Sequence, residues 1–199
     1  MQLESVRSLK AQLLAQGLTR KMVIRRDLPI RAAVVASAVP AAQLPPTIAV
    51  GIVPLVAAGR NNIDAAVALV GPGIGVDPLT LQGLGALAGV RATPLESGEL
   101  VWKVGRTTGL TQGMVSATEL DDLTVQYDIG DLVFDDQIEI GPAVPGQPFS
   151  MGGDSGSLIV DAQRNAVALL FAGNDVDATY ANPIAAVLSG VQAQFQAMV

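Results

Sequence analysis

The chain has 199 residues, half of them hydrophobic, and its 12 basic and 18 acidic side chains leave a formal net charge of −6. This balance argues against a nucleic-acid-binding groove, which needs clustered Lys and Arg. The chain contains no cysteine and no histidine. These absences exclude disulfides, thiolate nucleophiles, histidine metal ligands and a Ser-His-Asp triad built from this chain alone. We expect neither a metal site nor a cofactor.

Residues 1–46 are predicted to form a separate N-terminal segment. In residues 1–18, apolar side chains recur at helical spacing and predict an amphipathic helix. Residues 32–59 carry no charge, but four prolines interrupt them and most of their side chains are small, so we expect no membrane span. The expected location is the cytoplasm. Secretion is the alternative if translation starts at Met22, because two arginines and an apolar run would then resemble a leader peptide.

Residues 47–199 are predicted to form one β-rich unit. Short apolar or alternating segments separated by turn residues indicate strands, and the connections are too short for repeated βαβ crossovers. The sequence therefore favours an antiparallel barrel or sandwich. The strands are expected at residues 47–54, 64–70, 99–104, 113–119, 123–127, 132–140, 157–160 and 166–171.

The C-terminal residues change to a helical period. Asn182 is expected to cap the helix, with Pro183 at its first position. Apolar residues from Ile184 to Met198 then follow one helical face, so a helix is predicted over residues 183–198.

The strongest local motif is the sequence GGDSGS at residues 152–157. A nucleophilic serine needs an exposed hydroxyl on a tight turn, with backbone N–H groups that point toward a developing oxyanion. Glycines permit the backbone conformations that such a turn requires. Taken alone, the motif also fits an ordinary glycine-rich turn.

Its context resembles the trypsin/chymotrypsin-like serine protease family, in its bacterial form. Residues 152–157 resemble the nucleophile loop of this family, and GRTTGLTQG at residues 105–113 is similar to its G-x-T-T-G-x-T-x-G turn. NIDAAVA at residues 62–68 resembles the strand that holds the triad aspartate, and Asp64 precedes Ser155 by 91 residues, which suits the family. The resemblance covers residues 47–199. It implies an all-β, chymotrypsin-like double β-barrel with a complete second barrel; together with the patterns above, the expected fold has a reduced first barrel and a helix at each end of the chain.

The resemblance also implies site residues. Ser155 matches the nucleophile, the backbone N–H groups of Gly153 and Ser155 match the oxyanion hole, and Asp64 matches the carboxylate that orients the base. Asp154 matches a structural acid beside the nucleophile. The substrate pocket is expected to include Phe149, Phe171, Ala172 and Gly173, with a place in the core as the alternative for Phe149.

The chain lacks the general base of the family pattern. The pattern places a histidine ahead of Asp64, and this chain has no histidine. Only residues 19–63 are available for the first barrel, so that barrel is expected to be reduced. A serine hydroxyl without a base is a poor nucleophile. Lys21 is a candidate alternative base, although the arginines around it suggest a solvated basic patch, and Lys103 is expected to face solvent.

Three hypotheses follow. The chain is a serine endopeptidase with Ser155 as nucleophile, using another base or a histidine from another chain and severely impaired in isolation. Alternatively, it is a non-catalytic pseudoprotease that binds a polypeptide, or a truncated relative of an active protease.

A reduced barrel would expose apolar surface and favour self-association. The acidic residues between 121 and 139 are expected to be solvated hairpin ends and not a calcium site.

Overall fold

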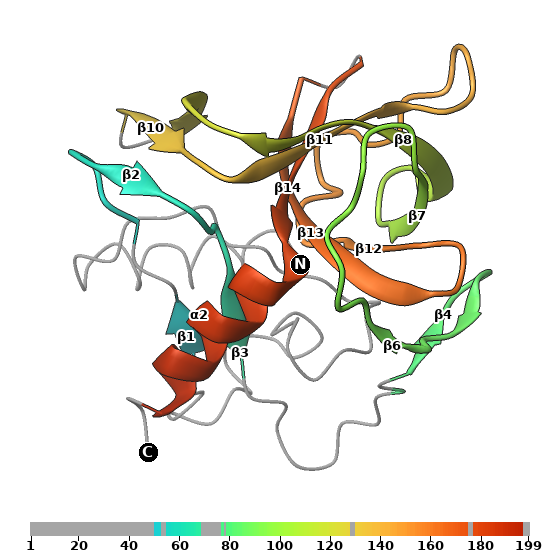
Figure 1. The fold of residues 1–199 in the computed structure, drawn as a ribbon, viewed down its shortest axis with the longest axis horizontal. Coiled ribbons are helices and arrows are strands. Elements are labelled where there is room, and N and C mark those ends of the chain that lie inside the picture. Colours follow the sequence, from blue (N-terminus) through green and yellow to red (C-terminus); the bar gives the residue numbers. More distant parts are fainter. Residues whose placement is uncertain are drawn as a thin grey trace, which may run out of the picture.

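The computed structural model describes residues 50–52, 55–68, 77, 79–127, 130–174 and 177–196. Its main body is a closed six-stranded barrel, shown in the upper right of Figure 1. Around the barrel, every neighbouring pair of strands is antiparallel. The strands follow the order β12 (Leu158–Val160), β7 (Leu100–Gly105), β8 (Gly109–Leu120), β11 (Gln137–Pro142), β14 (Thr179–Pro183) and β13 (Asn165–Gly173), and β13 pairs with β12 to close the barrel.

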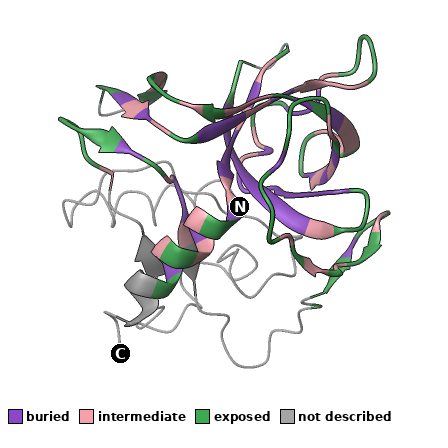
Figure 2. Ribbon diagram, viewed as in Figure 1, coloured by how far each residue is buried: buried purple, intermediate pink, exposed green. Residues whose placement is uncertain are grey.

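The prediction of an all-β fold with one complete barrel and a C-terminal helix is confirmed. Strand β13 has the longest run of buried residues among the described strands, which Figure 2 shows as a purple band. Its residues Ala166 to Ala172 are all buried, because the cluster in the barrel interior and three smaller clusters pack around the strand. A strand covered on both faces has no polar side, and this explains the uninterrupted apolar sequence AVALLFA.

A hairpin stands beside the barrel. It consists of β9 (Leu123–Tyr127) and β10 (Gly130–Phe134), and β10 also pairs in parallel with β2 (Arg60–Asn61). The single strand predicted over 132–140 is therefore wrong: the chain turns at Asp135 and Asp136 and continues as β11. Asp136 has a φ of 59°, a left-handed conformation that aspartate tolerates and that ends a strand.

The remaining short strands surround this body. β1 (Val50–Ile52) pairs antiparallel with β3 (Ala66–Ala68), β4 (Thr80–Leu81) pairs with β5 (Gly85–Ala86), and β6 (Gly89–Val90) adds to β13 in parallel. The sequence analysis missed β2, β4, β5, β6 and β14. The predicted helix over residues 1–18, the segment from 19 to 49 and the boundary at residue 46 lie outside the described residues, so the reduced first barrel stays a prediction.

The C-terminal helix α2 (Ile184–Gln196) packs on the segment that carries Asp64. Val187 and Val191 contact Ala65 and Leu169, and in Figure 1 the helix lies beside β1 and β3. The predicted cap is wrong: Asn182 lies in β14, and its side chain is used elsewhere, as described below. Within the described part of the chain, no helix is long and apolar enough to cross a membrane.

The packing of β8 against β11 gives a first prediction. A Cβ added to Gly113 would lie 2.6 Å from Cγ2 of Ile140 and 2.7 Å from Cδ2 of Phe149, both in the barrel interior. Because overpacking of a filled core costs about 1–3 kcal/mol, Gly113→Ala should lower the free energy of unfolding by about that amount in urea titrations. Gly141→Ala is the matched control, since the nearest atom to its Cβ would be 3.6 Å away. Equal stabilities of the two variants would contradict this packing.

Candidate functional site: the Ser155 loop and Asp64

Ser155 lies on the loop that leads into β12, and its side chain points toward β13. Its hydroxyl donates a hydrogen bond to the carbonyl oxygen of Phe171 at 3.2 Å. The loop is turned by a hydrogen bond from the N–H of Asp154 to the carbonyl of Met151, with Gly153 at a φ of 102°. This φ at the third residue of a turn is typical of glycine, so the GGDSGS motif forms a tight turn as predicted.

Asp154 fastens this turn to the β7–β8 connection. One carboxylate oxygen accepts hydrogen bonds from the N–H groups of Thr107 at 2.7 Å and Thr108 at 3.3 Å. The other accepts from the Thr108 hydroxyl at 2.6 Å and from the N–H of Met151 at 3.2 Å, and lies 3.3 Å from the ammonium of Lys103. The conformation of the Ser155 loop therefore depends on one buried carboxylate.

The position of Lys103 corrects the sequence analysis. Lys103 was expected to face solvent, but both its side chain and that of Asp154 are completely buried. The ammonium also donates to the Thr108 hydroxyl at 2.6 Å and lies 5.4 Å from the centre of the Phe149 ring. A lone ammonium cannot be buried cheaply, so Lys103 is inside because Asp154 is there.

Burial alone would raise the pKa of Asp154. The hydrogen bonds from Thr108 and from the N–H of Thr107, together with the charge of Lys103, outweigh burial and hold the pKa below its ordinary value. The carboxylate is therefore ionised at neutral pH. Lys103 forms an ion pair with it and in this arrangement is a structural cation, not a base for Ser155.

The side chains of Arg106 and Thr107 leave no room for a Cβ at Gly153. An added Cβ would come within 2.5 Å of Nη2 of Arg106 and 2.6 Å of the Thr107 hydroxyl. The exposed Arg106 guanidinium thus lies against the residue whose N–H is predicted to bind an oxyanion. The oxyanion role of the Gly153 and Ser155 N–H groups stays a prediction.

Asp64 lies between β2 and β3 and is 3% exposed. Its N–H donates to Oδ1 of Asn182 at 2.7 Å, and Nδ2 of Asn182 donates to the carbonyl of Leu169 at 3.3 Å. Asn182 therefore ties the Asp64 segment to β13 and does not cap the helix. Asp64 and Ser155 are both linked to β13, at carbonyls two residues apart.

The carboxylate of Asp64 accepts a hydrogen bond from a tyrosine. The hydroxyl of Tyr127, on β9, donates to Oδ2 of Asp64 at 2.8 Å. Burial raises the pKa of Tyr127, and the negative charge of Asp64 and this hydrogen bond raise it further, so the phenol stays protonated. In the family pattern the carboxylate orients an imidazole, whereas here it holds a phenol.

Three of the four predicted pocket residues lie in the core, in two different clusters. Phe149 belongs to the cluster inside the barrel, consistent with the alternative reading of this residue. Phe171 and Ala172 belong to a second cluster, in which the Phe171 and Phe134 rings lie 4.9 Å apart, and Gly173 is exposed at the end of β13. Their role in binding a substrate stays a prediction, and Lys21 lies outside the described residues.

Two residues that support the site were missed by the sequence analysis. Lys103 had one available signal, the small residue Gly105 two positions later, because a Cβ there would lie 2.7 Å from the lysine Nζ. Tyr127 had none, since a tyrosine in an alternating strand gives no indication of a distant partner. Among the described residues, no group of three acidic, histidine or cysteine side chains could hold a metal ion.

Solved structures with a similar fold are proteases. No family model and no curated protein matches the chain. A glutamic acid specific serine protease aligns at 22% identity over 65% of this chain and 65% of its own, with a TM-score of 0.45. Protease A of Thermobifida fusca aligns at 22% identity over 65% of this chain and 66% of its own, with a TM-score of 0.49. The HtrA-type protease AlgW, solved with a tripeptide, aligns at 20% identity over 70% of this chain and 41% of its own, with a TM-score of 0.44.

The predicted resemblance to chymotrypsin-like serine proteases is confirmed, since structures of that kind align with this chain. The chain covers just under two thirds of the first protease, about two thirds of the second and less than half of the third. At identities below 25% and TM-scores below 0.5, these alignments say nothing about activity, which must be inferred from the site itself.

The buried ion pair gives a second prediction. Lys103→Met removes the charge that balances Asp154 and leaves the carboxylate buried without it, which costs about 3–5 kcal/mol. We expect urea unfolding to show a loss of this size. Arg60→Met is the control, because Arg60 pairs with Asp122 and Asp135 at the surface and its side chain is 55% exposed, so its removal should change stability little. Similar losses in both variants would contradict the role of Lys103.

The Tyr127 phenol gives a third prediction, in the alkaline range. Its pKa is raised in the folded state, so above about pH 10 an unfolded chain loses a proton that the folded chain keeps. This difference stabilises the unfolded state as pH rises. Tyr127→Phe should therefore lose less stability between pH 9 and pH 11 than the wild type, as measured by urea unfolding at several pH values. Parallel pH profiles would argue against a buried, protonated Tyr127.

Proposed function

We propose that this chain is a serine endopeptidase-type protein in which Ser155 is the reactive hydroxyl, and that it is severely impaired as a hydrolase when isolated. The observation that carries the proposal is the Ser155 loop, turned at Gly153 and fastened by the buried Asp154. Such a loop presents a serine beside backbone N–H groups, which is the arrangement that acyl transfer needs. The substrate class is a polypeptide.

The impairment follows from proton transfer. When the Ser155 oxygen attacks a peptide carbonyl, its proton must pass to a base and then to the departing amine. No histidine exists in the 199 residues to carry it. Lys103 is engaged by Asp154, and the Tyr127 phenol remains protonated beside Asp64, so neither group can accept the proton. Removal of the base from a triad enzyme lowers kcat by a factor of about 10⁶.

A second candidate function is a non-catalytic module that binds polypeptides. The hydrogen bond from Tyr127 to Asp64 favours it, because a phenol satisfies the carboxylate that would otherwise orient a catalytic base. In this reading the barrel and the Ser155 loop hold a peptide without cleaving it. Two further alternatives are a truncated relative of an active protease and a protease completed by a histidine from another chain.

The test is labelling of the purified, folded protein with a fluorophosphonate probe, beside Ser155→Ala. We expect Ser155 to label at least about 10⁴-fold more slowly than the serine of a protease with a complete triad, since no base assists it. Ser155→Ala should remove whatever labelling remains.

Fast labelling that depends on Ser155 would overturn the impaired state and indicate an activated serine. Lys21→Ala and Tyr127→Phe would then identify the base. Labelling that is unchanged in Ser155→Ala would overturn Ser155 as the reactive hydroxyl.

A further inference from the structure

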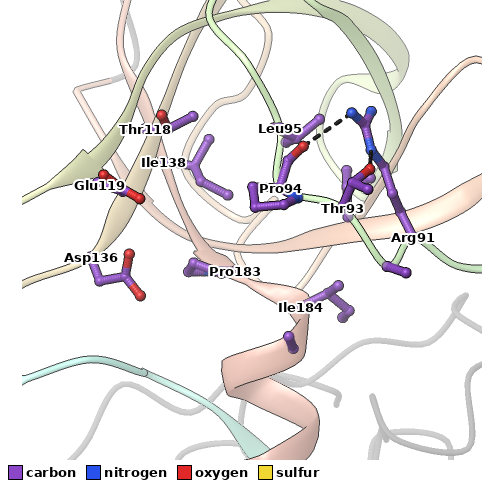
Figure 3. Close-up of a pocket in the computed structure, with 13 residues that line it drawn as sticks. Arg91, Thr93, Pro94, Leu95, Thr118, Glu119, Asp136, Ile138, Pro183 and Ile184 are labelled. Carbon is purple, nitrogen blue, oxygen red and sulfur yellow. Dashed lines mark hydrogen bonds between the residues drawn. The ribbon is translucent and has the colours of Figure 1, made fainter.

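A cavity of about 410 Å³ lies at the end of the barrel where α2 begins, and none of its lining residues belongs to the Ser155 loop. It lies between the segment that follows β6, the facing ends of β8 and β11, and the junction of β14 with α2 (Figure 3). Its buried apolar wall is formed by Leu95, Ile138, Val167 and Ile184. The volume lies within the range of small-molecule sites, and the buried wall offers an apolar contact surface.

The charges around the cavity are not balanced. Glu119 and Asp136 stand on one side and Arg91 on the other, as Figure 3 shows. Arg91 is already paired: its guanidinium donates twice to the carboxylate of Glu99, once to Thr93 and once to the carbonyl of Pro94, which uses four of its five N–H donors. By contrast, within the described part of the chain no ion pair or side-chain hydrogen bond engages the carboxylate of Glu119 or of Asp136.

The backbone places Glu119, whose side chain is exposed, at the rim of the cavity. The register of β8 against β11 shifts between Gln137 and Glu139, so Thr118 and Glu119 both lie opposite Ile138. Glu119 has a φ of 53°, as expected at a β-bulge. In a regular strand, consecutive side chains point to opposite faces, whereas here Thr118 and Glu119 both line the cavity.

We propose that this cavity binds an alkylguanidinium, either as a free small molecule or as an arginine side chain of a peptide. The cation would lie between the carboxylates of Glu119 and Asp136, where a planar guanidinium can donate to both. The aliphatic stem would cover Ile138 and Ile184. An anion is disfavoured, because the charge of Arg91 is already paired with Glu99 and the two carboxylates without an ion pair are negative.

The test is titration of the full chain with n-butylguanidinium, followed by NMR shifts of the Ile138 and Ala185 amides. The neutral isostere n-butylurea is titrated in parallel, and N-acetyl-arginine amide represents the peptide source. We expect both guanidinium compounds to bind and to weaken as salt is added, and the urea to bind at least about tenfold more weakly. A preference for N-acetyl-arginine amide would indicate a peptide, and a preference for n-butylguanidinium would indicate a free small molecule.

The double variant Glu119→Gln, Asp136→Asn removes both charges and keeps the polar shape, and Asn tolerates the left-handed backbone at residue 136. It should bind n-butylguanidinium at least about tenfold more weakly than the wild type. Asp131→Asn is the matched control, because Asp131 is an exposed carboxylate on β10 that does not line the cavity. Absence of binding to the wild type, equal binding of the urea, or equal weakening in the control would each overturn the proposal. A thermal melt of each variant confirms that it is folded.

Discussion

The buried pair of Lys103 and Asp154 is the interaction on which the site depends. Five groups converge on one carboxylate: two backbone N–H groups of the β7–β8 connection, the N–H of Met151, the Thr108 hydroxyl and the Lys103 ammonium. Two buried charges are costly unless their geometry is fully satisfied, so the pair holds the two segments in one arrangement. That arrangement sets the position of Ser155, which directly follows Asp154 in the chain.

The pair explains Gly105, and the β7–β8 connection that it holds explains Gly153. Gly105 leaves room for the lysine Nζ and the carboxylate, and Gly153 leaves room for Arg106 and Thr107 while it turns the loop. A Cβ at Gly105 would displace the ion pair, and a Cβ at Gly153 would crowd the Thr107 hydroxyl, which donates to the carbonyl of Gly152. The charges, the glycines and the turn therefore form a single unit, and this unit would be retained whether the serine attacks a substrate or only lies beside one.

The sequence predicted the elements with strong local patterns. The strands over 123–127 and 166–171, the GGDSGS turn and the C-terminal helix depend on alternation, glycine placement or helical period, and all are present. The single strand over 132–140 was wrong because a turn made by two aspartates gives no glycine or proline signal. The inward position of Lys103, the use of Asn182 to tie Asp64 to β13, and the Tyr127–Asp64 bond depend on pairing between distant segments. No local pattern encodes such pairing.

The closure of the barrel has a consequence for the order of assembly. Strand β12 pairs with β7 through Ile159 and Lys103, which are far apart in the sequence, and the Ser155 loop directly precedes β12. Closing so long a loop lowers the entropy of the chain, and this cost arises before the stabilising contacts can form. We therefore expect the Ser155 turn to take its final shape only when β12 pairs with β7. A chain in which β12 has not yet paired with β7 therefore contains Ser155 but lacks the contacts that position it.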